Sequence, residues 1–216
     1  MEYSIKNLIE NAKFGEAQRF KNLSIFPVSF NSENVIDYIS LDLAISKNYV
    51  KINEVTESGN VNTLFVENSS EYNVLLLDGE ELIGAKQNRV LNTTILIAKN
   101  SKTEVPVSCV ERGRWRYESR EFKTSNRIMS SSIKSKKMED VSFNLKMNPD
   151  SNDYRSDQGR VWSSVDELLV KRKIHSGSSA MSDAFDSSSD EMEKYMQKPV
   201  RMQACRKMLA GMRIII

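Results

Sequence analysis

The clearest pattern of hydrophobic and polar positions lies in residues 73–115. Runs of apolar, β-branched or alternating residues in this segment have the length and composition of strands, and they cover residues 74–78, 90–98 and 104–111. The links between these runs carry residue types that turns favour: Gly79, Gly84, Asn100 and Ser101. Short links reverse the chain direction, so the pattern predicts an antiparallel meander in which residues 78–89 form a connecting link.

Alternation also marks the part of the chain before this segment. Residues 50–55 and 61–68 alternate on either side of a turn-like ESGN sequence, which predicts a β-hairpin. Residues 36–48 fit either a strand that enters a short helix or a single helix. Residues 23–30 alternate around a proline, which confines such a strand to an edge or a bulge. Apolar side chains at helical spacing in residues 4–14 predict an amphipathic N-terminal helix.

The pattern changes after residue 120. Residues 120–157 are rich in serine, lysine and other polar residues, and this composition predicts a mobile loop. Helical periodicity returns in residues 161–173, with Asp157 or Ser156 at the position of an N-cap. A second, serine-rich stretch follows, within which residues 183–196 have the pattern of a short helix.

Together these elements predict an α+β fold over residues 1–200. Its main part is a largely antiparallel sheet built from residues 20–118 and packed by the N-terminal helix and by the helix of residues 161–173. Residues 120–157 would be a basic and serine-rich insertion. Residues 201–216 form a basic and apolar tail, which is a core element, a partner-binding helix, or the end of a truncated or frame-shifted gene.

Composition narrows the classes of function. A formal net charge of +2 gives no reason to expect nucleic acid or an anionic membrane as a partner. Two cysteines far apart and a single histidine argue against a metal site. The absence of P-loop, GxGxxG and HExxH motifs argues against an NTPase, a dinucleotide-dependent oxidoreductase and a zinc hydrolase, and no cofactor is expected. With no apolar leader and no run of about 18 apolar residues, the chain is expected to be cytoplasmic.

Three blocks of the sequence resemble a family that is defined by sequence alone. The blocks are DGEELIGAKQNRVLNTTILIA, VPVSCVERGRWRY and DQGRVW. The family is the ARG and rhodanese-phosphatase-superfamily-associated protein domain, and the resemblance runs from the N-terminal helix to about Val200, after which the chain departs from the expected longer apolar continuation. The name implies ADP-ribosylglycohydrolase and rhodanese-phosphatase types as neighbours in gene and domain arrangements, and it implies no activity. The matching positions are Gly79, Glu80, Gly84, Gln87, Asn88, Arg89, Cys109, Glu111, Arg112, Trp115, Gln158 and Trp162.

Polar side chains in and near the 78–89 link are candidates for binding a ligand. A loop with carboxylates, two amides and a guanidinium could bind a polyhydroxylated or phosphorylated small molecule, because arginine offers a fork to phosphate and glutamate accepts from hydroxyls. The alternative is that these groups satisfy one another and hold the turn, with Glu80 and Arg89 as an ion pair. The ligand-binding candidates are Glu80, Gln87, Asn88, Arg89, Arg112 and Gln158.

Cys109, Glu80 and Glu111 are the candidates for catalytic groups. A nucleophilic cysteine needs a nearby base, and the single histidine, His175, lies in a different segment. Glu111 lies two residues after Cys109 and so shares its strand face, and it could act with Glu80 as an acid/base pair. A hydrolase would use Glu80 or Glu111 with Arg89, or Cys109. The alternative for Cys109 is a small buried hydrophobe.

Arginines and aromatic residues alternate in residues 112–117. Cations and aromatic faces together suit the phosphates and bases of nucleic acid. Strand alternation gives another interpretation, a half-buried strand with a solvated arginine face and an aromatic core face. The arginine face would hold Arg112, Arg114 and Arg116, and the other face Gly113, Trp115 and Tyr117.

The function expected from these observations is that of a cytoplasmic accessory module that binds a small polar or nucleotide-like ligand. An ADP-ribose-like ligand is implied only by the neighbours of the family that the sequence resembles. The alternatives are a hydrolase and a nucleic-acid-binding module that acts through residues 112–116, and a protein is the other partner to consider.

Overall fold

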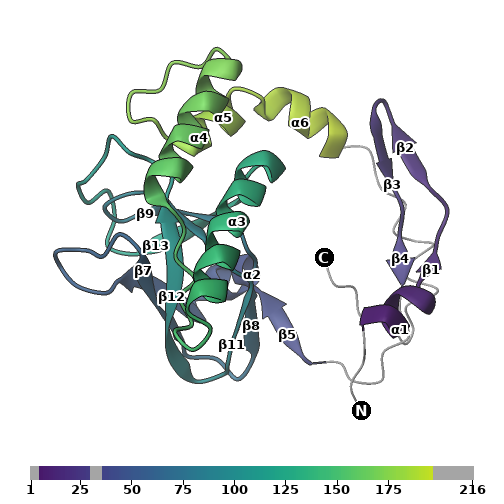
Figure 1. Cartoon of the computed structure of the whole chain (residues 1–216), viewed down its shortest axis with the longest axis horizontal. Helices are drawn as coiled ribbons and strands as arrows, with labels where there is room; N and C mark the ends of the chain where they lie inside the picture. The colour runs from purple at the N-terminus through teal and green to yellow at the C-terminus, as the bar shows by residue number, and fades with distance from the viewer. Residues whose placement is uncertain (1–4, 30–35, 197–216) are drawn as a thin grey trace. The chain divides into compact units, whose positions relative to one another are not determined.

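A computed structural model describes residues 5–29 and 36–196 of the chain (Figure 1). Its described residues divide into two compact units. The larger unit is Asp37–Ser187, and the smaller contains the described residues on either side of it. The α+β fold expected over residues 1–200 is seen in the larger unit, which holds both hydrophobic clusters.

The larger unit is built on a curled six-stranded antiparallel sheet with the order β13-β9-β10-β12-β7-β6. The predicted hairpin is confirmed, because β6 and β7 pair antiparallel with Val50 opposite Asn68. Side chains of β7 are buried alternately, as a strand with one covered face requires. The strands are β6 (Val50–Glu54), β7 (Thr63–Asn68), β9 (Glu80–Gly84), β10 (Arg89–Leu91), β12 (Ser101–Cys109) and β13 (Phe122–Ile128).

The larger unit also contains a three-stranded sheet with the order β11-β8-β5. Its strands are β11 (Ile95–Ile97), β8 (Asn73–Leu76) and β5 (Tyr38–Ser40). The single strand predicted over residues 90–98 is wrong, because β10 and β11 belong to different sheets. Asn92 lies between them, fully buried, donates to the Tyr154 carbonyl and accepts from the Ser108 hydroxyl. These two hydrogen bonds fix Asn92 at the point where β10 ends, and the chain changes direction there before β11 begins.

The predicted 78–89 link is also wrong in part, because it contains β9. This strand lies between β10 and β13, and both Glu81 and Leu82 are fully buried. A strand covered on both faces normally reads as a continuous apolar run. The buried acid Glu81 hides that signal.

The observed helices agree less well with the sequence-based predictions than the strands do. Of the two alternatives for residues 36–48, the structure has the strand entering a helix, as β5 leads into α2 (Leu41–Ser46). The mobile loop predicted over residues 120–157 is wrong, since it contains β13 and α3 (Ser131–Met147). The buried side of α3 holds Ile133, Lys137 and Val141, spaced four residues apart, and the lysine in the middle interrupts the apolar stripe that would have predicted the helix.

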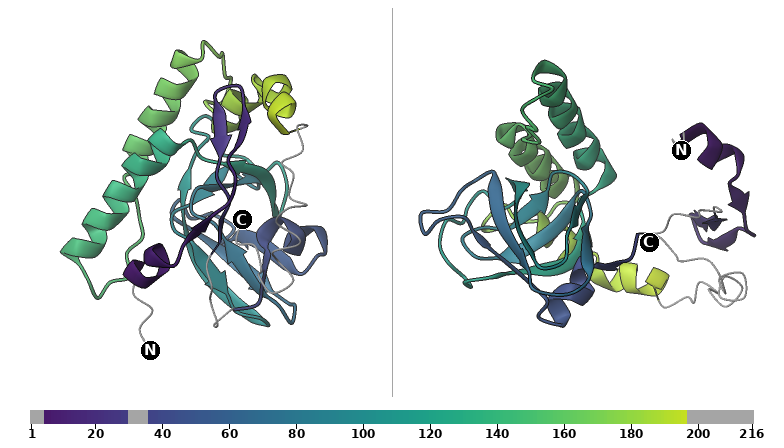
Figure 2. Two further views of the ribbon diagram at one scale, coloured as in Figure 1. Left: turned by 90° about the vertical axis from the view of Figure 1, so that its right-hand side faces the viewer. Right: turned by 90° about the horizontal axis from the view of Figure 1, so that it is seen from below.

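The predicted helix of residues 161–173 is confirmed as α4 (Gln158–Lys171). Asp157 is its N-cap, accepting from the Arg160 backbone N–H at 2.9 Å. With α5 (Met181–Asp186), α3 and α4 cover one side of the sheet (Figure 2). The cluster beneath them contains Val90, Val110, Met129, Ile133, Val161, Val165, Leu169, Met181 and Ala184.

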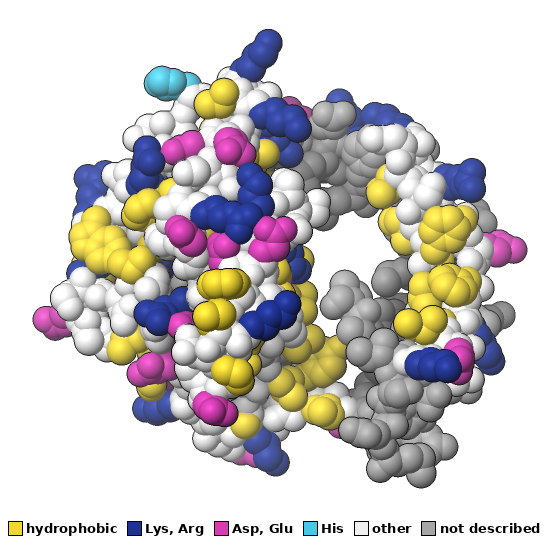
Figure 3. Space-filling view, in the orientation of Figure 1, with side chains coloured by type: hydrophobic (Ala, Val, Ile, Leu, Met, Phe, Trp, Pro, Cys, Tyr) yellow, Lys and Arg dark blue, Asp and Glu magenta, His cyan; other side chains and the backbone are white. Residues whose placement is uncertain are grey.

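Basic and acidic side chains interleave over the face of α3 and α4 that Figure 3 shows. Arg160 bridges to Glu139 at 2.7 Å and to Asp140 at 2.5 Å, and Lys136 to Glu167 at 3.1 Å. This face therefore carries no large patch of one charge, in agreement with the small net charge of the chain.

The smaller unit contains α1 (Ile5–Glu10), two short antiparallel ribbons and α6 (Ser189–Met196). The ribbons pair β1 (Lys13–Phe14) with β4 (Val28–Ser29), and β2 (Gln18–Phe20) with β3 (Leu23–Ile25). The predicted N-terminal helix ends at Glu10, and the predicted strand of residues 23–30 breaks at Phe26 and Pro27. The tail of residues 201–216 lies outside the described residues. No helix in the described ranges has the length and apolar character to cross a membrane.

Candidate functional site

The turn between β9 and β10 sets the geometry of the site. Gly84 and Ala85 both have positive φ, +114° and 41°, and a Cβ at Gly84 would lie 2.5 Å from the Ser119 hydroxyl. The Asn88 side-chain carbonyl accepts from the Gly84 N–H at 3.2 Å and closes the turn. Gln87, Asn88 and Arg89 are thereby directed into the protein, and all three are buried.

Glu111 is the acceptor at the centre of this network. Its Oε2 accepts from the Asn88 backbone N–H at 3.1 Å and from Arg114 Nε at 2.9 Å, and its Oε1 accepts from the Ser178 hydroxyl at 2.9 Å. Three of the roughly four lone-pair sites of this carboxylate are thus occupied by groups of the protein. Glu111 therefore holds the turn, as the structural interpretation of these groups predicts.

Arg114 is the main donor, and its side chain is only 10 % exposed. It donates to the Ala85 carbonyl at 2.8 Å and to the Asn88 side chain at 3.0 Å, as well as to Glu111. The half-buried strand predicted for residues 112–117 is wrong, because the chain turns after Glu111. Arg114 is inside, whereas Trp115 and Tyr117 are about half exposed.

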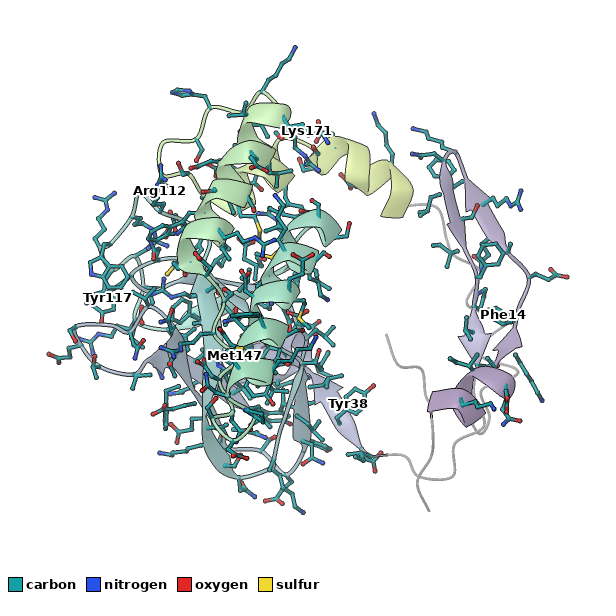
Figure 4. The ribbon with its side chains drawn as sticks, viewed as in Figure 1. Phe14, Tyr38, Arg112, Tyr117, Met147 and Lys171 are labelled. Carbon is teal, nitrogen blue, oxygen red and sulfur yellow. The ribbon has the colours of Figure 1, made fainter. Side chains whose placement is uncertain are left out.

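Arg112 lies apart from this network. Its side chain is 54 % exposed and pairs with Asp166 at 3.3 Å. Arg112 and Tyr117 are carried by the connection between β12 and β13 (Figure 4). Arg112, Arg114 and Arg116 thus do not form the open row of cations that the nucleic-acid hypothesis requires.

Arg89 is fully buried and is held from one side. Its Nη1 donates to the Gln87 side-chain oxygen at 2.6 Å and to Cys109 Sγ, and Gln87 in turn donates to the Glu111 carbonyl. Its Nη2 lies 3.7 Å from Oε1 of Glu54, whose side chain is 3 % exposed. The ion pair predicted between Arg89 and Glu80 is therefore replaced by one with Glu54.

Glu54 was missed in the sequence. It ends β6, and the alternation of that strand places it on the face of Val50 and Ile52, which are core residues. An acid at a position that the strand period assigns to the core is a signal that could have found it. Both Glu54 oxygens and the Nε and Nη2 atoms of Arg89 lack hydrogen bonds to any residue in the described ranges.

Aromatic side chains and a second cation lie beside this pair. The Trp115 ring centroid is 5.5 Å from Arg89 Cζ, and Lys86 Nζ is 5.6 Å from the Trp115 centroid and 4.9 Å from that of Tyr117. Lys86 Nζ and the Tyr117 hydroxyl both donate to the Glu57 carbonyl, which ties the β6–β7 connection to this group. Two half-exposed rings with cations at their faces can stack a planar or sugar group and attract an anion.

Cys109 is the last residue of β12 and has no exposed surface. Burial raises the pKa of its thiol to about 11, although Arg89 opposes the shift. Gln158, the first residue of α4, accepts from the Cys109 N–H and donates to its carbonyl, both at 2.8 Å. Cys109 is thus a protonated core residue at neutral pH, and Gln158 pairs with its backbone.

Glu80 lies at the opposite end of β9 from the turn. It accepts from the Leu77 N–H at 3.1 Å, and burial raises its pKa, with a further contribution from Asp42. Because Glu111 binds the turn at the other end of β9, the acid/base pair of Glu80 and Glu111 is not formed.

The neighbouring Glu81 has the more unusual environment. It is fully buried opposite Val90, and burial raises its pKa to about 7. Ser125 and Arg127 are close enough to oppose this shift, but neither Glu81 oxygen makes a hydrogen bond of good geometry within the described residues. The carboxyl group is therefore largely neutral below neutral pH.

The rest of the described chain offers an open groove but no metal site. Within it, no group of three or more His, Cys, Asp or Glu side chains is placed to hold a metal ion. An open groove of about 750 Å³ runs along β11, β12 and residues 151–155, and none of the predicted site residues lines it.

Comparison with models of protein families matches residues 11–216 to the ARG and Rhodanese-Phosphatase-superfamily-associated Protein domain. The match extends through residues 201–216, beyond the point at which the sequence was expected to depart from the family. Comparisons with curated proteins and with solved structures return no match.

Proposed function

Since the chain belongs to the ARG and Rhodanese-Phosphatase-superfamily-associated Protein domain family, we propose that it is an accessory module that binds a small polar, nucleotide-like ligand. The family name associates the domain with other proteins and assigns no reaction. An ADP-ribose-like ligand in the cytoplasm is the specific form of this proposal. A free buried thiol at Cys109 agrees with a reducing compartment.

One observation carries the proposal, the position of Lys86 between two half-exposed aromatic rings. Its Nζ lies 4.9 Å from the Tyr117 centroid and 5.6 Å from the Trp115 centroid. Stacking of a base on an exposed ring stabilises a complex by about 1 to 3 kcal/mol, and a lysine beside the ring supplies the charge for a phosphate. Tyrosine and tryptophan are enriched at binding interfaces, where the ring supplies apolar contact and the polar tip a hydrogen bond.

The contacts of the catalytic candidates support binding over hydrolysis. Cys109 is a protonated thiol, Glu111 has both oxygens engaged, and Glu80 bonds the backbone of its own turn. None of these groups is a free base or nucleophile beside the aromatic pair.

The test uses tryptophan fluorescence, because the chain has two tryptophans, Trp115 and Trp162. In a Trp162→Phe background, Trp115 is the only tryptophan, so selective excitation of tryptophan reports on Trp115 alone. We expect adenosine diphosphate or ADP-ribose to quench this emission saturably and to raise the melting temperature by mass action.

Variants locate the binding. Trp115→Ala and Lys86→Ala, tested by melting temperature in the wild-type background, should each abolish the ligand-dependent rise. Phe143→Ala is the matched control, since Phe143 is an exposed aromatic residue on α3, with 63 % exposure. Nucleotides and sugar phosphates that neither quench Trp115 nor raise the melting temperature would refute the proposal.

A further inference from the structure

The buried pair of Glu54 and Arg89 has a specific deficit of hydrogen bonds. In the described part of the chain, two acceptor atoms, Glu54 Oε1 and Oε2, and two donor atoms, Arg89 Nε and Nη2, make no hydrogen bond. The two side chains are 3 % and 0 % exposed. More than about nine in ten buried polar groups in proteins are hydrogen-bonded, so four unmet atoms at one place indicate a missing partner.

The combination of two unmet acceptors and two unmet donors restricts the chemistry of that partner. A phosphate or a carboxylate would satisfy Arg89 but be repelled by Glu54, and an ammonium group would do the reverse. Each hydroxyl group donates one hydrogen bond and accepts others. Two neighbouring hydroxyls therefore offer two donors to Glu54 and two acceptors to Arg89, which matches the deficit atom for atom.

We infer that Glu54 and Arg89 bind the vicinal diol of a ribose-like sugar. The inference rests on the proposed function and names the part of the ligand that enters deepest. The base or sugar ring would pack on Trp115, and Lys86 would lie near the phosphate.

The surroundings fix the orientation of the pair. Gln87 and Cys109 both accept from Arg89 Nη1, and these two contacts hold the guanidinium. Its Nε and Nη2 atoms make no hydrogen bond within the described residues, and Nη2 lies 3.7 Å from Glu54 Oε1. Glu54 is carried by β6, whose partner β7 holds it in a paired hairpin. Both groups are thus placed before a ligand arrives, which lowers the entropic cost of binding.

Trp115 lies against the Arg89 side of the pair. Its ring lies 5.5 Å from Arg89 Cζ and packs on Gly59, where an added Cβ would be 3.3 Å from ring atom Cζ2. Because the Trp115 side chain is already 49 % exposed, rotating it away gives up only part of a buried surface. A diol reaches Glu54 and Arg89 when the ring moves off Gly59.

The test compares ribose and deoxyribose forms of the same probe on the full chain with Trp162→Phe. The probes are adenosine diphosphate against 2′-deoxyadenosine diphosphate, and ribose 5-phosphate against 2-deoxyribose 5-phosphate. We expect each ribose form to bind about ten- to hundredfold more tightly, the effect of one hydrogen bond to a charged group. In Glu54→Gln this ratio should fall to about one, because an amide replaces one acceptor with a donor.

Glu104→Gln is the control, since Glu104 is an exposed glutamate on β12. Glu54→Asp, which keeps the charge but has a shorter side chain, is the second variant should Glu54→Gln fail to fold. The ratio of ribose to deoxyribose affinity in the wild-type protein tests the inference without any variant at Glu54. Equal affinities for ribose and deoxyribose forms would overturn the diol inference and leave the proposed function standing. A preference for the ribose form that persists in folded Glu54→Gln would also overturn the diol inference. If no nucleotide or sugar phosphate binds, both are refuted.

Discussion

Arg114 Nη2 and Glu111 Oε2 lie 2.7 Å apart in a buried ion pair between residues only three positions apart in the chain. The guanidinium also holds the Ala85 carbonyl and the Asn88 side chain. The planar fork of an arginine is needed for this, and a lysine has a single point of attachment. Arg114→Lys should therefore lower the free energy of unfolding by about 2 to 4 kcal/mol in urea titrations.

Arg112→Lys is the matched control for this variant. Arg112 is 54 % exposed and forms a surface ion pair with Asp166, so the change should stay within about 1 kcal/mol. Equal effects of the two variants would show that Arg114 does not organise the turn.

Glu81 makes stability depend on pH. Its pKa is about 7 in the folded protein and near 4.5 when exposed. Between these values the folded state holds a proton that the unfolded state has lost, so the free energy of unfolding falls as the pH rises from about 4.5 to 7 and is level above that. The loss amounts to up to about 3 kcal/mol.

Glu81→Gln keeps the shape and removes the titration. Urea unfolding at pH 5 and at pH 8 should differ less in this variant than in the wild type, and the variant should be the more stable of the two at pH 8. Glu104→Gln, at an exposed position, should leave the wild-type slope unchanged. A slope that persists in Glu81→Gln would assign the dependence to another group.

Cys109 should be inert to thiol reagents in the native state. The reactive species is the thiolate, and burial raises the pKa of this thiol to about 11. In a Cys205→Ser background at pH 8, a disulfide reagent should label Cys109 only after denaturant is added. Rapid labelling of the folded protein would contradict its burial and reopen the nucleophile hypothesis.

Lys137 ties α3 to the sheet through Asp78 and two backbone carbonyls, those of Leu91 and Asn92. Lys137→Met removes the fully buried one of the two lysines that pair with Asp78 and leaves the carboxylate with Lys134 alone, at 3.4 Å. The change should cost about 3 to 5 kcal/mol of stability. Adding Asp78→Asn to Lys137→Met should recover part of that loss, because the largely buried carboxylate that has lost its closer cation is then neutral. A double variant less stable than Lys137→Met would mean that Asp78 has a separate role.

Secondary structure was predictable where the burial pattern and the polarity pattern coincide. The β6–β7 hairpin has one covered face, so its alternation is visible in the sequence. The α4 helix has an apolar stripe and an Asp157 cap, and both are visible. Hydrophobic periodicity with a start signal is sufficient in such cases.

Buried charged residues explain most of what was missed. Glu81 hides β9, Lys137 interrupts the stripe of α3, and Glu54 falls on the core face of β6. Each of these charged side chains is buried by residues that are distant in the sequence. Lys137, for example, is paired with Asp78, which lies 59 residues away. A window of neighbouring residues cannot contain that information.

The sequence named most residues of the network around the β9–β10 turn, but not how they are grouped. Gln87, Asn88 and Arg89 lie together with Cys109 and Glu111 in one hydrogen-bonded network. Glu80 and Arg112 lie apart from them.

The pairing of the Gln158 side chain with the Cys109 backbone also protects the protein from self-association. β7 pairs with β12 only as far as Pro106, so beyond that point the side of β12 that faces away from β10 has no strand partner within the described chain. An open strand edge is a template for aggregation, and the Gln158 amide occupies this one with the same donor and acceptor that another strand would offer. Because Gln158 lies 49 residues further along the chain, the edge is uncovered until α4 has docked. Self-association should thus be greatest during refolding at high protein concentration and should fall once the helix is in place.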